Sequence, residues 1–288
     1  MKIITLNSHS IVEKNYNEKL NIFVDVILKE KPDIFALQEV NQSIILPEVA
    51  PDSLKGYVPC TEVPTHIRED NHALKVANLL RQSGLPYEWV WIPLKVGYGK
   101  YDEGIAIFSL SPIVETRQFY ISNIRDYNNW KTRKILGIKT KDTRDVWFYS
   151  SHYGWWDDEE EPFKNQWDIT DYKIKSDLSL DELCYILGDF NAPCNLRGES
   201  YDYVKNTGWL DTWELAENKD EGITVGKVID GWRHKLEDAS AYGMRLDYIW
   251  CNKNINVKLS KVICNGDNYD VVSDHYGVMI EIEDGGLN

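Results

Sequence analysis

Short runs rich in apolar, β-branched and aromatic residues recur along the whole chain of 288 residues. Runs of this kind, bounded by polar or turn-forming residues, predict strands. A helical pattern separates the first two runs, because apolar residues recur at i, i+3, i+4 and i+7 between Leu20 and Leu28. The chain therefore has to place many strands in sheets. The strands are predicted at residues 2–7, 34–37, 87–92, 104–109, 114–121, 134–139, 145–151, 184–188, 245–251, 257–263 and 276–282.

The predicted helices are fewer than the strands. A second helix is predicted between Ala73 and Leu80 and would end at Ser83-Gly84, and a weaker helical pattern runs over residues 159–181. The sequence contains no internal repeat and no linker rich in Pro, Gly or Ser. Two halves, each a sheet with flanking helices, would form a layered sandwich of α and β. The length allows one domain or two.

Polar clusters stand at the ends of several predicted strands. Rigid strands fix ligand groups at such positions, while the adjoining loops leave room for a substrate. Each cluster by itself has an ordinary structural explanation, since a strand-terminal asparagine often caps a turn and a lone histidine is often structural. Their recurrence predicts a functional site. The clusters are Leu6-Asn7, Gln38-Glu39, Ser151-His152, Gly188-Asp189-Phe190-Asn191, Arg245-Leu246-Asp247-Tyr248 and Ser273-Asp274-His275.

The oxygen-bearing side chains of these clusters predict a metal site. Carboxylate and amide oxygens are hard ligands, which suit Mg²⁺ or Mn²⁺ and not zinc. The predicted donors of this kind are Glu39, Asp189, Asn191 and Asp274.

Two histidines add acid–base groups to the predicted metal site. His152 and His275 supply imidazoles, and Glu103 and Asp247 are carboxylates that could each orient one of them. A metal ion with two carboxylate–histidine pairs can neutralise charge, activate water and support a leaving group. These residue types therefore predict the hydrolysis of a phosphate ester.

The charge of the chain disfavours nucleic acid as a partner. The net charge is −14, from 32 Lys and Arg against 46 Asp and Glu. Proteins that bind a phosphate backbone usually carry a basic stripe, because its cations release counterions. No such stripe is visible in the sequence.

The remaining composition predicts a cytoplasmic protein that does not enter a membrane. No apolar stretch approaches the length of a membrane span. After Met1-Lys2 the chain enters a predicted strand instead of a signal sequence. The five cysteines are scattered and lack C-x-x-C spacing, so neither a zinc site nor a disulfide framework is predicted.

The ordered motifs resemble those of the endonuclease/exonuclease/phosphatase superfamily. The resemblance runs from position 7 to position 275, and its most specific elements are G-D-F-N at 188–191 and S-D-H at 273–275. In that superfamily the first and last motifs share one site. The resemblance therefore implies a single domain over residues 1–288, with an α/β fold built as a four-layer αββα sandwich of two packed mixed β-sheets.

The same resemblance implies roles for the metal-site residues. Glu39 would be the principal Mg²⁺ ligand, with Asn7 and Asp274 close to the metal. Asp189 and Asn191 would orient the attacking water and the phosphate.

Two catalytic pairs are also implied by the resemblance. His275 would pair with Asp247 and act in acid–base catalysis or phosphate stabilisation. Glu103 is similar to the glutamate that partners the histidine found here at position 152. Both His152 and His275 would then be catalytic.

Within the superfamily the chain resembles the bacterial maltose-6′-phosphate phosphatases. The motifs that carry this resemblance are Leu6-Asn7-Ser8-His9-Ser10, Trp130-Lys131-Thr132-Arg133 and His152-Tyr153-Gly154-Trp155-Trp156. It implies an Mg²⁺-dependent phosphomonoesterase of carbohydrate metabolism. Its substrate would be a small phosphorylated sugar, such as maltose 6′-phosphate or a related disaccharide phosphate.

Four residues of these motifs are predicted to bind the substrate. Lys131 and Arg133 are predicted phosphate contacts, because a dianion needs cations besides Mg²⁺, although an ordinary solvated hairpin would carry the same residues. Trp155 and Trp156 are predicted to stack on sugar rings, although tryptophans that anchor a loop would look the same. A metal-dependent nuclease of the abasic-site or deoxyribonuclease type would share the catalytic motifs and is the alternative.

Overall fold

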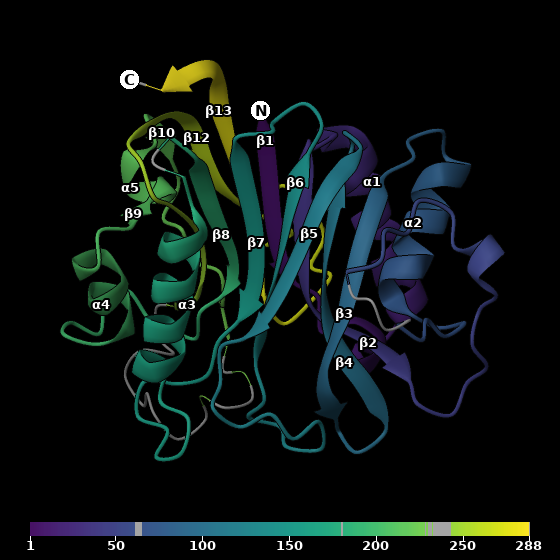
Figure 1. The fold of residues 1–288 in the computed structure, drawn as a ribbon. Helices are drawn as coiled ribbons and strands as arrows, with labels where there is room; N and C mark the ends of the chain where they lie inside the picture. The colour runs from purple at the N-terminus through teal and green to yellow at the C-terminus, as the bar shows by residue number, and fades with distance from the viewer. Residues whose placement is uncertain (61–64, 180, 228, 230–231, 233–242, 288) are drawn as a thin grey trace.

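Two mixed β-sheets pack face to face in the computed structural model, which describes residues 1–60, 65–179, 181–227, 229, 232 and 243–287 (Figure 1). The first sheet has seven strands in the order β10 (Asn218–Lys219), β12 (Ile255–Ile263), β13 (Gly277–Leu287), β1 (Lys2–Asn7), β2 (Ile34–Ser43), β4 (Tyr101–Ser109) and β3 (Glu88–Gly97). The second has six strands in the order β5 (Ile113–Tyr120), β6 (Lys134–Thr140), β7 (Val146–His152), β8 (Leu183–Asp189), β11 (Asp247–Cys251) and β9 (Leu210–Asp211).

Helices cover the outer face of each sheet, so the four-layer αββα prediction is confirmed. Figure 1 shows α1 (Tyr16–Glu30) and α2 (His72–Gln82) on one side, and α3 (Phe163–Asp177) and α4 (Ser200–Asn206) on the other. One apolar core lies between the two sheets and another beneath each helical layer. The short elements are α5 (Thr212–Leu215), η1 (Ser10–Val12) and η2 (Pro51–Ser53).

The third helix is shorter than its sequence pattern predicted. A helix was expected within residues 159–181, but α3 begins after Pro162, whose ring fixes φ and suits the start of a helix. The buried side chains of Phe163, Trp167 and Ile174 then face the second sheet. The acidic run at 157–161 lies in the loop before the helix.

Strand pairing brings the polar strand ends to one end of the sandwich. β1 and β2 are parallel, with Asn7 opposite Gln38. β7 and β8 are also parallel and place His152 opposite Asp189, while the antiparallel β11 places Asp247 opposite the same aspartate. In Figure 1 both chain termini lie at the other end of the sheets.

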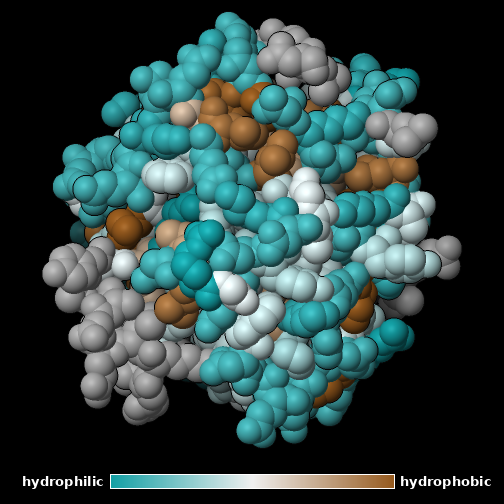
Figure 2. Space-filling view, turned by 90° about the vertical axis from the view of Figure 1, so that its left-hand side faces the viewer, coloured by the Kyte–Doolittle hydropathy of each residue, from teal (hydrophilic) through white to brown (hydrophobic). Residues whose placement is uncertain are grey.

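The surface over α3, α4 and α5 is mainly hydrophilic. Figure 2 shows this face as a teal surface with separate, smaller brown areas. Among the described residues, no helix is long and apolar enough to cross a membrane.

His72, the first residue of α2, is a buried titratable group that belongs to none of the polar strand ends. It is 4% exposed, and its Nδ1 lies 2.9 Å from the Tyr16 hydroxyl. Burial, assisted by the charge of Lys75, lowers the pKa of His72 to about 3. An unfolded histidine titrates near pH 6.5, so between these values the unfolded chain binds a proton that the folded chain does not.

We therefore expect His72 to make the free energy of unfolding fall by about 1 kcal/mol per pH unit as the pH decreases from about 6.5 towards 3. The variant His72→Asn should lack this contribution and show a shallower decrease. Urea denaturation of both proteins at pH 7.5, 6.5, 5.5 and 4.5 measures the difference. Equal slopes in the two proteins would show that His72 does not cause the acid sensitivity.

Candidate active site

A cavity of about 260 Å³ opens where the polar strand ends meet. Most residues that the sequence predicted for a site line this cavity. Asn7 and Asp247 lie behind the wall and bond to carboxylates or imidazoles that line it. The predicted residues in the lining are Glu39, Glu103, Arg133, His152, Trp155, Asp189, Asn191, Asp274 and His275.

Glu39 reaches the cavity because β2 is irregular at this point. The pairing of β2 with β4 shifts register between Leu37 and Val40, and Glu39 has a φ of +52°. Bulges re-aim side chains next to functional sites, and a left-handed glutamate persists because its surroundings fix it. Burial and the neighbouring Glu103 raise the pKa of Glu39. The Glu39 carboxylate is thus held among like charges.

Asn7 links the two central carboxylates. Its Nδ2 donates to Glu39 Oε1 at 2.9 Å and to Asp189 Oδ2 at 3.0 Å. The residue before Asp189 is Gly188, with a φ of +146°, and a Cβ there would collide with the Ser151 carbonyl oxygen. Glycine therefore lets β8 approach β7 closely enough to place Asp189 beside the cavity.

His275 and Asp247 form a buried pair. The His275 Nδ1 lies 2.8 Å from Asp247 Oδ2, and its Nε2 lies 3.7 Å from Asp189 Oδ2. Burial opposes protonation of His275, but the carboxylates of Asp247 and Asp189 outweigh this and raise its pKa. Burial also raises the pKa of Asp189, to about 7. The predicted pairing of His275 with Asp247 is present in the geometry.

His152 lies in a different environment from His275. Its Nε2 is 3.5 Å from Asp189 Oδ2, and its Nδ1 has no hydrogen-bond partner among the described residues. Burial, followed by the charges of Arg133 and Lys95, lowers the pKa of His152. Asp189 therefore lies between His152, whose surroundings favour the neutral imidazole, and His275, whose surroundings favour the charged one.

The predicted pairing of Glu103 with His152 is wrong. Glu103 Oε1 instead forms an ion pair with Lys95 Nζ at 3.0 Å, and both side chains are buried. The pairing of β3 with β4 shifts register between Pro93 and Lys95, and this irregularity brings the lysine opposite Glu103. The Lys95–Glu103 ion pair forms part of the cavity wall.

Arg133 is a buried cation in the cavity wall without a carboxylate partner within ion-pair distance among the described residues. Its Nη1 donates to the Trp130 carbonyl oxygen at 2.9 Å, while its Nε has no hydrogen-bond partner in the described part of the chain. Burial lowers its pKa. A buried charge without a counter-ion is costly, so this position favours an anionic ligand.

Lys131, the other predicted phosphate contact, does not line the cavity. Its Nζ forms ion pairs with Asp158 Oδ1 and Glu160 Oε2, each at 2.8 Å. Those acidic residues come from the loop before α3, so Lys131 fastens that loop. The prediction that Lys131 binds phosphate conflicts with this geometry.

The two adjacent tryptophans point in different directions. Trp155 lines the cavity and packs edge-to-face on Trp130, with ring centroids 5.8 Å apart. The Trp155 Nε1 is buried and has no hydrogen-bond partner among the described residues. Trp156 packs instead against Phe163 and Tyr203. The predicted sugar contact at Trp156 is therefore a loop anchor in the structure.

The site also contains residues that were not predicted from the sequence, among them Lys95, Trp232 and His9. Lys95 follows Pro93 in an apolar run, and a proline in an edge strand is a signal of the irregularity that places Lys95. Trp232 Nε1 donates to Asn191 Oδ1 at 3.0 Å and fixes that amide, but no local pattern marks this tryptophan. His9 lines the cavity beside Asp274, within a motif already noted for its resemblance.

The donors present fit a divalent metal ion. Glu39 and Asp189 are bridged by one amide, and burial raises the pKa of both carboxyl groups. Carboxylates crowded in this way are stabilised by a cation, and oxygen donors suit Mg²⁺ or Mn²⁺. Two clusters of described residues are close enough to hold an ion, Asp189 with Asp247 and His275, and His9 with Glu13 and Asp274.

The sequence pattern of the Endonuclease/Exonuclease/phosphatase family matches residues 4–275. No curated protein matches the chain. Among solved structures, an endonuclease/exonuclease/phosphatase family protein from Leptotrichia buccalis C-1013-b is 32% identical, with a TM-score of 0.84. The match covers 98% of this chain and 99% of that chain.

Two more distant structures are similar in fold. A mannosyl-6-phosphatase from Bacteroides thetaiotaomicron is 17% identical, with a TM-score of 0.65 over 98% of this chain and 99% of that one. TDP2 from D. rerio, complexed with single strand DNA product, is 15% identical, with a TM-score of 0.58 over 97% of each chain. At these identities the likeness shows the fold alone.

Proposed function

The chain belongs to the endonuclease/exonuclease/phosphatase family, whose members are hydrolases, and we propose that it is a phosphomonoesterase acting on a phosphorylated sugar. The preferred substrate would be a disaccharide phosphate such as maltose 6′-phosphate, and Mg²⁺ or Mn²⁺ would be the cofactor. We place the enzyme in the cytoplasm, because its five cysteines are all free, as is usual in a reducing compartment.

Arg133 is the observation that carries this proposal. Its guanidinium is buried in the wall of a cavity of about 260 Å³, next to the carboxylates that would hold the metal. A terminal phosphate carries up to two negative charges, so a metal ion and one buried guanidinium can bind it. A small ester fits a cavity of this size better than a duplex does.

Glu39, Asn7 and Asp274 would hold the metal, which when bound supplies charge neutralisation and a more acidic water. The Asp189 carboxylate, placed between two imidazoles, would accept the proton of the attacking water.

The remaining groups of the site would orient the ester. The Asn191 amide is fixed by Trp232 and by the Tyr153 carbonyl oxygen, to which its Nδ2 donates at 3.0 Å. Its orientation toward the water or the phosphate is thereby set. Asp247 holds the Nδ1 side of His275, so that Nε2 would donate a hydrogen bond to a phosphate oxygen.

The aromatic wall and the net charge support a sugar in place of a nucleic acid. Trp130 and Trp155 offer flat apolar faces, which stack on sugar rings. A duplex would bring many phosphates against a protein of charge −14. The fold is shared with a mannosyl-6-phosphatase and with TDP2, so both substrate classes occur on this architecture.

A phosphate-release screen tests the proposed function. Purified protein would be incubated with disaccharide phosphates, hexose 6-phosphates, nucleotides and an aryl phosphate, each with Mg²⁺ and with excess chelator. We expect sugar phosphates to be hydrolysed best, and no turnover in the chelator. Rapid release from nucleotides with no release from sugar phosphates would contradict the proposed substrate.

The two tryptophans should respond differently to replacement. We expect Trp155→Ala to raise KM for a disaccharide phosphate by up to about 10-fold, because a stacking contact contributes on the order of 1 kcal/mol. KM for an aryl phosphate should rise less. Trp156→Ala is the matched control, which should lower the melting temperature without changing the ratio of the two KM values. An unchanged ratio in Trp155→Ala would show that this indole does not bind the sugar.

A further inference from the structure

His9 lies on a strained turn that directly follows β1. His9 and Ser10 have φ values of +46° and +42°, in the left-handed region that side chains seldom occupy without fixed surroundings. The Ser10 hydroxyl fixes this backbone. It donates to the Glu39 carbonyl oxygen at 2.7 Å and accepts from the Asn41 backbone N–H at 3.1 Å. The turn is thereby tied to the strand that carries Glu39.

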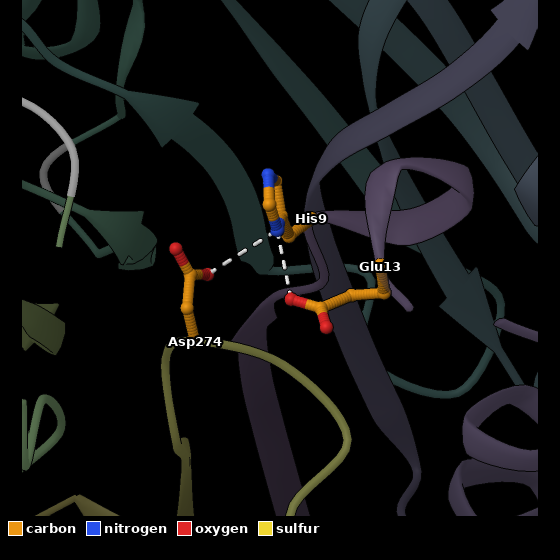
Figure 3. Close-up of side chains that lie close together, drawn as sticks. All are labelled: His9, Glu13 and Asp274. Atoms are coloured by element: carbon orange, nitrogen blue, oxygen red, sulfur yellow. Dashed lines mark hydrogen bonds and ion pairs between the residues drawn. The ribbon is translucent and has the colours of Figure 1, made fainter. Parts of the chain in front are cut away.

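The two ring nitrogens of His9 have different neighbours. Its Nδ1 lies 2.7 Å from Glu13 Oε1 and 3.8 Å from Asp274 Oδ1. Figure 3 shows both carboxylates at this nitrogen and the other ring nitrogen pointing away from them. That second nitrogen, Nε2, lies 3.3 Å from the Tyr98 hydroxyl, and both His9 and Tyr98 line the cavity.

The charges around His9 differ from those around Arg133. His9 has a carboxylate within hydrogen-bond distance, because Glu13 Oε1 lies 2.7 Å from its Nδ1, and Lys19 forms an ion pair with the same glutamate. The polar groups around the Nδ1 side of His9 are therefore already paired with one another. Arg133 has no carboxylate within ion-pair distance among the described side chains, and Glu103 and Glu39 act on its charge only from farther away, so a phosphate would be drawn to Arg133 and an uncharged group would fit beside His9.

Tyr98 completes this part of the cavity. It stands on the turn between β3 and β4 with 57% of its surface exposed, and its ring centroid lies 6.4 Å from that of His9. A hydroxyl group both donates and accepts a hydrogen bond. The His9 Nε2 and the Tyr98 hydroxyl, 3.3 Å apart, offer a matching pair of polar atoms.

We propose that His9 and Tyr98 bind hydroxyl groups of the sugar and determine specificity for the hydroxyl-rich part of the ester. This inference rests on the proposed function and names the groups that recognise the sugar. Glu13 would act as a positioning residue, because it holds Nδ1 and leaves Nε2 directed toward Tyr98. A metal ion at His9, Glu13 and Asp274 is disfavoured, since Lys19 already forms an ion pair with Glu13.

Three variants test the proposal on two substrates, a disaccharide 6′-phosphate and an aryl phosphate without hydroxyl groups. His9→Asn suits the left-handed backbone, because asparagine tolerates it. Tyr98→Phe removes a single hydroxyl, and Glu13→Gln keeps the shape of the positioning residue. The matched control is Lys14→Gln, which lies exposed to solvent in the turn between η1 and α1. Melting temperatures check that each variant folds.

We expect KM for the disaccharide phosphate to rise several-fold, up to about 10-fold, in both His9→Asn and Tyr98→Phe, as for the loss of a hydrogen bond. KM for the aryl phosphate should change far less, and Lys14→Gln should match the wild type on both. Equal losses on both substrates, or no loss on either, would overturn the inference. If the wild-type protein hydrolyses the aryl phosphate but no sugar phosphate, the proposed function itself is wrong.

Discussion

Replacing Glu39 with glutamine should lower kcat/KM for the best phosphate ester by about 10³-fold or more, since a bound metal ion contributes several kcal/mol to transition-state stabilisation. Glutamine keeps the size of the side chain and its bond with Asn7 but removes the charge that would hold the metal. Titration calorimetry with Mn²⁺ should show a matching loss of affinity. The wild-type protein should likewise lose nearly all of its activity in excess chelator.

Glu18→Gln is the control for this substitution. Glu18 lies exposed in the first turn of α1, so its variant should keep both activity and metal affinity. Removing the crowded charge at Glu39 should not unfold the protein, because burial and Glu103 already disfavour that charge. Full turnover of Glu39→Gln, or of the wild type in chelator, would contradict a catalytic metal at Glu39.

His275 and Asp247 should behave as one unit in a double-mutant cycle. Each of His275→Gln and Asp247→Asn is expected to lower kcat by roughly 10²–10⁴-fold, the range for acid–base groups. The double variant should be little worse than either single one, because Asp247 acts through the imidazole that it holds at 2.8 Å.

An exposed histidine–carboxylate pair provides the control for the cycle. His66 Nδ1 lies 2.8 Å from Glu48 Oε2, and both side chains are largely solvent-exposed. His66→Gln and Glu48→Gln should leave kcat at the wild-type value. Fully additive losses for His275 and Asp247, with all variants folded, would show that the two residues act independently.

The layered fold could be predicted because its signals are local. Apolar runs marked the strands, and the polar residues at their ends marked the site. The structure brings Glu39, Asp189, Asp274 and both histidines to one cavity because parallel pairing of β1 with β2 and of β7 with β8 aligns the strand ends. The strand ends themselves were less well predicted. The second strand was predicted to end at residue 37, because Asn41 and Gln42 lack the apolar pattern of a strand. In the structure β2 continues to Ser43, and both of these polar side chains are buried and hydrogen-bonded.

The errors in the predicted site have non-local causes. Lys95 faces Glu103 because of a register shift in β3, which residue types alone do not reveal. Lys131 is engaged by Asp158, which lies 27 positions away and in another loop. Trp155 and Trp156 are adjacent and identical in type, so the sequence cannot distinguish them. In the structure Trp156 packs on Phe163, and Trp155 lines the cavity.

A sugar phosphatase and a nuclease differ most in their relative activity on a sugar phosphate and on DNA. The kcat/KM of the wild-type protein with Mg²⁺ would be measured for a disaccharide 6′-phosphate, by phosphate release, and for supercoiled plasmid DNA, by nicking. We predict a far higher value for the sugar phosphate, because Arg133 and the metal site match one terminal phosphate while the protein as a whole carries a charge of −14. Nicking of DNA with a kcat/KM equal to or above that of the best sugar phosphate would rule out a sugar phosphatase and identify a nuclease.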